Sequence, residues 1–447
     1  MDLNALPMKT MQSPGFWIII LTTILFSACQ SGSVLSKKEQ GELASAMEVP
    51  ALGQHFQGLV VYDPGTKEVV YEHNGDHLFT PTSNIKILTL RAALENLPDS
   101  MPLYEQLNAG RSMYLRGTGH PAFFHPDFDA TLHEGQLTLM VRGFDSLFLL
   151  APKVSPRRFG SGWAWDDYSY SYQTERSALP LFGNSLFVEW DSMRSEILIH
   201  PDYLAQYSNI RLGKGKKIEV KREEYINEFQ IRVGAQSPHE TRVASPYFIE
   251  PYVQTRLLEE ALKQPFRQRY SAPAGRWIKQ GFFPMDTVLR KMMWESDNFL
   301  AEQILLMVAR ELTDSLNTAA GIRATRRDSG QIRWVDGSGL SRYNLVTPNY
   351  LVGELDRIQS LIGWEGVQDY FPINGRRGTL KDRYETFDGI IYAKTGSLSN
   401  NYNLSGYLKS KSGKWYIFSY MHNHFIGEAD ELDEDIERVL YYLHSKL

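Results

Sequence analysis

The chain has 447 residues, of which 43% are hydrophobic and 22% are charged, a balance typical of globular proteins that bury a core. The formal net charge of -5 is small for this length and argues against nucleic acid as the main partner, because phosphate binding needs a concentrated basic surface. The length predicts two domains, or one domain that carries a large insertion.

The N-terminal residues have the pattern of an export signal. Residues 16–26 form an apolar run of eleven, too short to span a membrane, for which about 20 are needed. The run follows Lys9 and ends at the small residues Ser27 and Ala28. This order of basic, apolar and small residues is typical of a secretory signal, so residues 1–28 are assigned to a signal peptide.

Cys29 is the only cysteine of the chain, so no internal disulfide is expected. Residues 26–29 (Phe-Ser-Ala-Cys) resemble a bacterial lipobox, in which the cysteine is acylated, although Phe26 replaces the usual leucine. We therefore predict lipidation at Cys29, where each buried CH₂ of the acyl chains contributes about 0.8 kcal/mol to membrane binding. The alternative is an incidental cysteine in an ordinary signal peptide. Residues 29–47 are largely polar and are predicted to form a lipidated tether.

The folded part begins with a predicted β-hairpin and a buried helix. Residues 58–62 and 68–72 are rich in strand-forming residues and flank a Pro-Gly turn. The helix follows, with Pro81 near its start and apolar residues on nearly all sides up to Leu94.

Ser83 and Lys86 stand three residues apart at the start of this helix, which places both side chains on one face. An amine in that position can take the proton of the hydroxyl, and the helix N-terminus favours negative charge. A lysine on a buried helix needs a reason, because a desolvated ammonium costs several kcal/mol unless it is paired. One such reason is catalysis by an amine whose pKa is lowered by burial. Taken alone, a Ser-x-x-Lys pair is usually a surface accident.

Two further short motifs follow along the chain. Ser296-Asp297-Asn298 stands between predicted helices at 287–294 and 299–310, where polar side chains can face a cleft. Taken alone, this motif is also a good helix N-cap. Lys394-Thr395-Gly396 ends a predicted strand that begins at residue 389, and a substrate backbone can lie along such an edge. The alternative is an edge-strand lysine that prevents aggregation.

Together, S-x-x-K, S-D-N and K-T-G are the signature of penicillin-binding proteins and class A β-lactamases. On these motifs the chain resembles the class C low-molecular-mass penicillin-binding proteins, the D-alanyl-D-alanine carboxypeptidase/endopeptidase group. The other segments that match the group are Val335 to Arg342 with Asn344, Gly378-Thr379-Leu380 with Arg383, Leu404 to Tyr407, and Gly162-Trp163 with Asp166. His120 stands where the group usually has aspartate.

The resemblance implies an α/β (α+β) serine penicillin-recognising fold, in which helices flank an antiparallel sheet, with a large β-rich insertion. The separation of Lys86 from Ser296 exceeds what the compact fold needs. Residues 96–265 are therefore assigned to the inserted module, and residues 48–95 and 266–447 to a discontinuous catalytic domain. Apolar residues on one face predict a helix over residues 432–443 at its end.

The resemblance also implies catalytic roles. Ser83 would attack the carbonyl of the penultimate D-alanine of a peptidoglycan stem peptide and form an acyl-enzyme. Lys86 is the candidate base for acylation, and Ser296 would relay the proton to the leaving amine. The backbone amides of Ser83 and Ser397 would hold the oxyanion.

The remaining motif residues are expected to bind substrate. By the same resemblance, Asn298 would hold the substrate amide, and Lys394 and Thr395 would bind its terminal carboxylate. Gly396 leaves room for the substrate backbone along the strand edge. No cofactor and no metal are expected.

The predicted function is that of a serine-type D-alanyl-D-alanine carboxypeptidase that β-lactam antibiotics acylate. We expect it on the periplasmic side of a bacterial membrane, held by the lipid anchor at Cys29. Two alternatives are a β-lactamase or esterase with the same acylation chemistry, and a non-catalytic wall-binding or antibiotic-sensing lipoprotein. The deacylation rate distinguishes the first, and the three intact motifs count against the second. The sequence leaves open whether the enzyme also acts as an endopeptidase.

Three other groups of residues are interpreted as structural. His422 and His424 lack the carboxylate spacing that would suggest a metal site. The aromatic residues of segment 163–172 are predicted to lie in the core of the inserted module. The basic residues of segment 214–222 are interspersed with Glu and Gly and predict a solvated hairpin.

Overall fold

The computed structural model describes residues 35–49, 55–191, 193–194, 196–234, 236–238, 241–327, 332–387, 389–427 and 429–447. The predicted signal peptide and the predicted lipidation site at Cys29 lie outside these residues. Within the described ranges, no helix is both long enough and apolar enough to cross a membrane.

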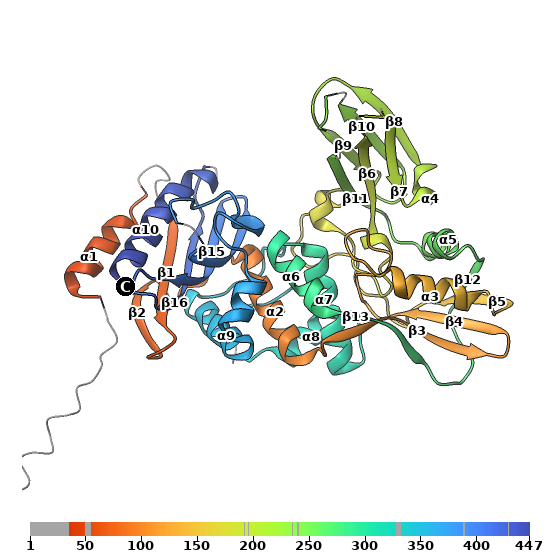
Figure 1. Ribbon diagram of the computed structural model, residues 1–447, viewed down its shortest axis with the longest axis horizontal. Coiled ribbons are helices and arrows are strands. Elements are labelled where there is room, and N and C mark those ends of the chain that lie inside the picture. Colours follow the sequence, from red (N-terminus) through yellow and green to blue (C-terminus); the bar gives the residue numbers. More distant parts are fainter. Residues whose placement is uncertain are drawn as a thin grey trace, which may run out of the picture.

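A five-stranded antiparallel sheet is the centre of the catalytic part, which lies on the left in Figure 1. Its strand order is β14-β15-β16-β1-β2, so the predicted N-terminal hairpin pairs with strands from the end of the chain. The strands are β1 (Phe56–Asp63), β2 (Glu68–His73), β14 (Ile391–Leu398), β15 (Asn401–Lys409) and β16 (Trp415–Asn423). This arrangement joins the two halves of the discontinuous catalytic part.

The sheet carries a core on each face, because successive side chains of a strand point to opposite sides. Val60 of β1 belongs to the core that includes α2 and α9, whereas its neighbours Leu59 and Val61 belong to the core that includes α1 and α10. Figure 1 shows α1 and α10 on one side of the sheet and α2 and α9 on the other. The helices of this part are α1 (Lys37–Ala46), α2 (Ile85–Asn96), α6 (Met285–Glu295), α7 (Asn298–Thr313), α8 (Thr318–Thr325), α9 (Pro348–Tyr370) and α10 (Asp433–Lys446).

Helix α1 differs from the tether predicted over residues 29–47. Ser36 and Glu39 form a capping box, in which each side chain accepts a hydrogen bond from the backbone N–H of the other residue. Leu43 is fully buried in the core shared with α10, and Tyr442 Oη donates to Glu39 O at 3.0 Å. An isolated helix of this length is marginal in water, so contacts with α10 stabilise it. The polar composition of this segment gave no indication that Leu43 packs against α10.

The inserted region contains three sheets among its described residues, on the right in Figure 1. A mixed sheet has the order β12-β5-β4-β3-β13, and two three-stranded sheets have the orders β11-β6-β7 and β8-β10-β9. The strands are β3 (Ser100–Ala109), β4 (Ser112–Gly117), β5 (Ser146–Leu150), β6 (Ser185–Asp191), β7 (Glu196–His200), β8 (Ser208–Gly213), β9 (Ile218–Arg222), β10 (Phe229–Gly234), β11 (Thr241–Pro246), β12 (Phe266–Arg269) and β13 (Ile278–Pro284). The accompanying helices are α3 (Thr131–Val141), α4 (Asp202–Ala205) and α5 (Pro251–Leu262).

The end of the insertion differs from the boundary predicted at residue 265. Strand β12 pairs with β5, and β13 pairs with β3, so both strands belong to the sheet of the inserted region. Helix α6 starts directly after β13, and it is the first element that returns to the catalytic part. Pairing with distant strands determines this boundary, and local sequence pattern does not reveal it.

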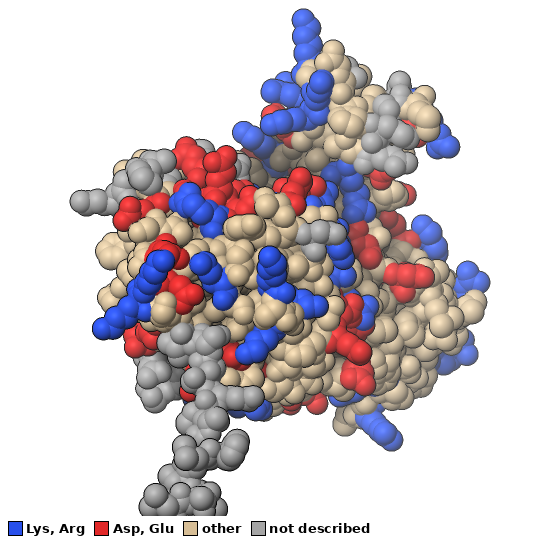
Figure 2. Space-filling view, turned by 60° about the vertical axis from the view of Figure 1, so that its left-hand side comes forward, with Lys and Arg blue, Asp and Glu red and all other residues tan. Residues whose placement is uncertain are grey.

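The tip of the insertion is basic and solvated, but segment 214–222 is not the predicted hairpin, because β8 and β9 lie on opposite sides of β10 and do not pair with each other. Figure 2 shows lysine and arginine side chains gathered there, and Lys214, Lys216, Lys217 and Lys221 are all exposed. Arg222 is an exception, because it is buried and its Nε donates to Pro246 O at 2.8 Å. The solvated interpretation is therefore wrong for Arg222.

Candidate active site

The three motifs predicted from the sequence meet in one cleft of about 450 Å³. Ser83 lies in a 3-10 turn (Thr82–Asn84) directly before α2, Ser296 follows the end of α6, and Asn298 is the first residue of α7. Strand β14 forms one wall with Thr395 and Ser397. The residues that line the cleft are Ser83, Ala164, Asp167, Tyr172, Gln173, Ser296, Asn298, Gly339, Leu340, Arg342, Thr379, Thr395, Ser397, Leu398 and Ser399.

The amine of Lys86 has three hydrogen-bond partners. Nζ lies 2.9 Å from Ser83 Oγ, and it donates to Asn298 Oδ1 at 2.6 Å and to Ser338 O at 2.7 Å. A neutral amine has two N–H groups and one lone pair. Because the oxygens of Asn298 and Ser338 can only accept, they use the two N–H groups, and the lone pair is left for the Ser83 hydroxyl proton. This geometry suits a general base.

Burial allows a fraction of the Lys86 amine to be uncharged near neutral pH. Lys86 is completely buried, and the loss of hydration lowers its pKa from 10.5 to about 8. The negative charges of Asp297, Asp336 and Glu302 act in the opposite direction and keep the pKa from falling further. At pH 7 about one amine in ten is therefore neutral.

Ser296 and Lys394 form a second pair on the other side of the cleft. Ser296 ends α6 in the left-handed region (φ 57°), and Lys394 Nζ donates to its Oγ at 2.8 Å. This leaves the O–H of Ser296 to donate to another group. Lys394 is completely buried behind Ser296, and burial together with the nearby Lys86 holds its pKa well below the usual value. Lys394 thus contacts Ser296 but is not among the residues that line the cleft, whereas Thr395 lines the cleft itself.

The S-D-N motif is both a helix cap and part of the site. Asp297 is the N-cap of α7, where its carboxylate accepts from Leu300 N at 2.8 Å. Asn298 contacts Lys86 through Oδ1 and donates from Nδ2 to Tyr172 O at 2.8 Å. The side-chain amide expected to hold substrate therefore joins Lys86 to the inserted region.

Two glycines let the backbone pack closely around Ser83. A Cβ on Gly396 would lie 2.0 Å from Thr82 Oγ1 and 2.9 Å from Ser83 N, so only glycine allows β14 this near. A Cβ on Gly339 would lie 1.8 Å from Thr82 O. Thr82 itself has a φ of 52°, a strained value for a β-branched residue, and Asn403 Nδ2 donates to its Oγ1 at 3.1 Å.

Asp336 organises the loop that carries Ser338. Its carboxylate accepts from Gly339 N at 3.0 Å, Ser341 N at 2.7 Å, Asn344 Nδ2 at 2.7 Å and Trp163 Nε1 at 2.8 Å. The sequence placed this segment in the resemblance without a role for any of its residues. Thr379, which was matched in the same way, accepts a hydrogen bond from Thr395 Oγ1 at 2.8 Å beside the cleft.

The aromatic residues of segment 163–172 are not core residues as a group. Trp165, Tyr170 and Tyr172 are exposed over 75%, 52% and 43% of their surface, so that interpretation is wrong for these three. Tyr172 lines the cleft, and its ring stacks on Tyr170 at a centroid distance of 5.3 Å. Aromatic density in the sequence does not distinguish a core from an exposed wall.

His422 is buried, and its Nδ1 lies 3.3 Å from His55 Nε2. Across the described part of the chain, no group of three or more His, Cys, Asp or Glu side chains is placed to hold a metal ion.

The fold and this site define a serine acyl-transfer enzyme of the penicillin-recognising class, with a hydroxyl, a partly neutral lysine and a second serine around one cleft. The chain belongs to the D-Ala-D-Ala carboxypeptidase 3 (S13) family, whose model matches residues 39–230 and 268–442. It is therefore a serine-type D-Ala-D-Ala carboxypeptidase, as the motifs predicted.

Individual relatives agree over most of the chain. The sequence is 26% identical to a D-alanyl-D-alanine carboxypeptidase of Actinomadura sp. over 89% of this chain and 83% of that protein. It is 24% identical to the D-alanyl-D-alanine carboxypeptidase DacB of Haemophilus influenzae over 83% of this chain and 86% of the relative. The crystal structure of penicillin binding protein 4 (dacB) from Haemophilus influenzae has a TM-score of 0.72 at 20% identity, and covers 91% of this chain and 99% of its own. The last comparison shows that the fold is shared.

Proposed function

We propose that Ser83 is the nucleophile with which this carboxypeptidase cuts the terminal D-Ala-D-Ala bond of peptidoglycan stem peptides. The observation that carries the proposal is the position of Lys86 Nζ, 2.9 Å from Ser83 Oγ, with its two N–H groups bound elsewhere. A lysine whose pKa is about 8 can accept the hydroxyl proton near neutral pH.

Acylation then proceeds in two steps. As Ser83 Oγ bonds to the carbonyl carbon of the penultimate D-alanine, its proton passes to Lys86 and the carbonyl oxygen becomes an oxyanion. Backbone N–H groups at Ser83 and Ser397 are our candidates for stabilising that oxyanion. When the intermediate collapses, the C–N bond breaks and Ser296 donates a proton to the leaving amine. Ser296 is suited to this role because its oxygen already accepts from Lys394. The proton that Lys86 took from Ser83 then returns to Ser296, so Lys86 is neutral again and the Ser296 hydroxyl is restored.

Deacylation completes the cycle. Water attacks the ester carbonyl, one of its protons goes to a base at the site, and the Ser83 hydroxyl is restored with release of the shortened peptide. A β-lactam would enter the same path, but its amine would stay tethered to the acyl group after the ring opens. We therefore propose that β-lactams acylate Ser83 and remain bound for longer than a peptide.

Intact-mass spectrometry with benzylpenicillin tests the proposal. The soluble form (residues 30–447) should gain one penicilloyl mass that persists for minutes, and the Ser83→Ala variant should gain none. The wild type should also release D-alanine from a D-Ala-D-Ala peptide, and the variant should not. Rapid loss of the drug without an adduct would favour a β-lactamase. A folded protein that gives neither adduct nor turnover would refute a catalytic Ser83.

We also propose that the enzyme is exported and held on the periplasmic side of a bacterial membrane by a lipid on Cys29. The support is the sequence pattern of residues 1–29, with its basic, apolar and small segments before a single cysteine. Metabolic labelling with a fatty-acid probe in a bacterial host should mark the wild-type protein and leave Cys29→Ser unmarked. Equal labelling of both, or labelling of neither, would refute the anchor.

A further inference from the structure

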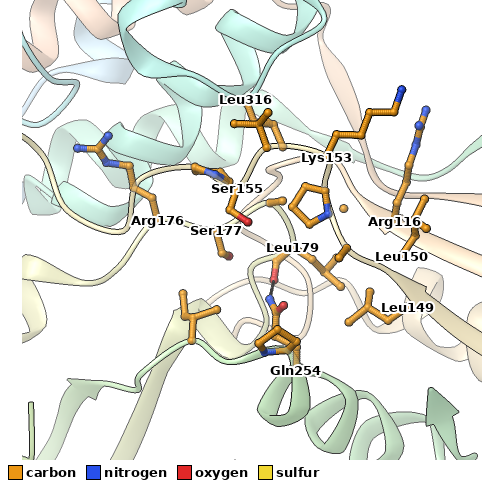
Figure 3. Close-up of a pocket in the computed structure, with 18 of the residues that line it drawn as sticks. Arg116, Leu149, Leu150, Lys153, Ser155, Arg176, Ser177, Leu179, Gln254 and Leu316 are labelled. Atoms are coloured by element: carbon orange, nitrogen blue, oxygen red, sulfur yellow. Dashed lines mark hydrogen bonds between the residues drawn. The ribbon is translucent and has the colours of Figure 1, made fainter. Parts of the chain in front are cut away.

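A second cavity, of about 860 Å³, lies between the inserted region and the C-terminal end of α7. Figure 3 shows its walls, with Leu316 from the catalytic part on one side and Leu149 and Gln254 from the inserted region on the other. The described lining shares no residue with the catalytic cleft. Its volume lies within the range of about 300–1,000 Å³ that small-molecule sites occupy.

Helix α7 separates the two sites. Asn298 at its first turn lines the catalytic cleft, and Arg310 in its last turn lines the cavity. At about 1.5 Å per residue, these two positions are roughly 18 Å apart along the helix axis. A ligand in the cavity is therefore a separate molecule, or a separate part of a long polymer, from the peptide bound at Ser83.

The cavity wall is basic. Its charged residues are Arg116, Lys153, Arg158, Arg176, Arg310 and Asp314. One carboxylate, that of Glu105, serves both Arg116 (2.6 Å) and Arg310 (2.8 Å). Positive charge therefore exceeds negative charge on this wall.

Lys153 contributes a cation without an ion pair among the described residues, and it is exposed to solvent. Figure 3 shows Lys153 and Arg116 on the same flank of the cavity, with their side chains extended. Arg176 differs, because its guanidinium points away from the cavity, toward the buried Glu302 at 3.2 Å. Arg158 is also paired, because its Nε lies 3.5 Å from the buried Glu175 carboxylate. The groups available to a ligand are thus Lys153 and the pair of arginines that share Glu105.

The rest of the wall suits the body of a peptide. Apolar side chains and prolines line it, among them Leu149, Pro152, Leu179 and Leu316, and Ser155 and Ser177 add hydroxyl groups. Guanidinium groups match carboxylates through paired N–H donors, and a lysine adds a point charge. A short peptide with free carboxylates combines these two features.

We propose that this cavity binds the carboxylate-bearing end of a second peptidoglycan stem peptide, already without its terminal D-alanine. The choice of peptide rests on the proposed function, since the enzyme itself releases such carboxylates from neighbouring stems. Occupancy would hold the enzyme on trimmed wall while Ser83 works on another stem.

Calorimetry with a synthetic L-Ala-γ-D-Glu-L-Lys-D-Ala tetrapeptide tests this proposal, using protein first acylated at Ser83 by benzylpenicillin so that the catalytic cleft is occupied. The tetrapeptide should bind, its affinity should fall as salt rises, and the form with both carboxylates amidated should bind at least tenfold more weakly. Inorganic phosphate is the competing probe. Saturable binding of phosphate without binding of the tetrapeptide would overturn the assignment to a peptide.

Matched variants locate the binding. Lys153→Glu alone, and Lys153→Glu with Arg116→Gln, should weaken binding of the tetrapeptide at least tenfold while acylation of Ser83 is unchanged. The control pair Lys214→Glu with Lys217→Gln changes exposed charges at the tip of the insertion and should leave binding intact. Equal affinity in the cavity and control variants, or no binding to any form, would refute the cavity. Failure of acylation itself would instead refute the proposed function.

Discussion

Asn298 accepts a hydrogen bond from Lys86 Nζ at 2.6 Å through Oδ1. On its other side, the same amide donates from Nδ2 to Tyr172 O at 2.8 Å, so one neutral side chain connects the inserted region to the amine of Lys86. Its neutrality matters because a carboxylate in the same place would stabilise the ammonium form of Lys86. The asparagine thus orients the amine without raising the pKa of Lys86.

Replacing this amide by a carboxylate should shift the pH dependence of acylation. In Asn298→Asp, a negative charge next to Lys86 raises the pKa of the amine, by at least one unit when the pair is buried. The rate of penicilloyl formation, measured by intact mass between pH 6 and 11, should rise at higher pH than in the wild type. Asn298→Ala removes an acceptor without adding charge and should slow acylation at every pH. An unchanged midpoint in Asn298→Asp would contradict the role of Lys86 as base.

The wild-type enzyme should acylate faster as pH rises through about 8. Only the neutral amine of Lys86 can accept the Ser83 proton, and burial lowers the pKa of that amine to about 8. The acylation rate should therefore increase about tenfold per pH unit well below pH 8 and level off above it. Stopped-flow measurement with a chromogenic β-lactam checks this. A rate that stays flat between pH 6 and 9 would indicate a different base.

The lowered pKa of Lys86 should also make the free energy of unfolding depend on pH. The folded protein releases the Lys86 proton near pH 8, whereas the unfolded chain keeps it until about 10.5. The free energy of unfolding should therefore rise by about 3 kcal/mol, from this group alone, as the pH rises from 8 to 10.5. The same amount is lost when the pH falls back through this range. Denaturant unfolding of the wild type should show this gain relative to Lys86→Met, which cannot titrate. Parallel curves for the two proteins would show that Lys86 has an ordinary pKa.

Gly396→Ala should disrupt the close packing of β14 against the turn that carries Ser83. The added Cβ would lie 2.0 Å from Thr82 Oγ1, so either the strand or the Ser83 turn must move. Positioning errors of this kind reduce catalysis by about 100-fold. Gly353→Ala in α9 is the control, because its new Cβ meets no atom within 4 Å. Acylation rates and melting curves of both variants check the prediction, and an active Gly396→Ala would contradict the tight contact.

Much of the site was predictable because its motifs are local. Ser83 and Lys86 lie one helical turn apart, and Ser296 and Asn298 flank a helix cap, so spacing alone places each pair. What the sequence could not supply are the contacts between distant segments. The partner of Asn298 Nδ2 is the backbone carbonyl of Tyr172, and the second acceptor around Lys86 is the carbonyl of Ser338.

The differences in the fold have a similar cause. Residues 37–46 look like a polar tether, yet Leu43 is buried against a helix some 390 residues later in the chain. Strands β12 and β13 come after the predicted end of the insertion at residue 265, and only their pairing with β5 and β3 assigns them to the inserted region. Composition describes such segments one at a time, whereas tertiary pairing determines where they belong.

Removing the charge of Glu302 should shift the pKa of Lys86 in the direction opposite to Asn298→Asp. Its buried carboxylate accepts from Ser338 N at 2.8 Å, forms an ion pair with Arg176 at 3.2 Å and raises the pKa of Lys86. Glu302→Gln keeps an acceptor for Ser338 but removes the charge, so the pKa of Lys86 should fall and acylation should reach its plateau at lower pH. The unpaired Arg176 should also destabilise the fold, by about 3–5 kcal/mol.

Glu354→Gln separates these two effects of Glu302→Gln. Glu354 is also buried and forms an ion pair with an arginine, Arg91, at 2.7 Å, but it is not among the charges that shift the pKa of Lys86. Both variants should therefore melt at lower temperature, whereas only Glu302→Gln should move the pH midpoint of acylation downward. If the two variants gave the same midpoint, Glu302 would have only a structural role, and the loop at Ser338 would position Lys86 without influencing its charge.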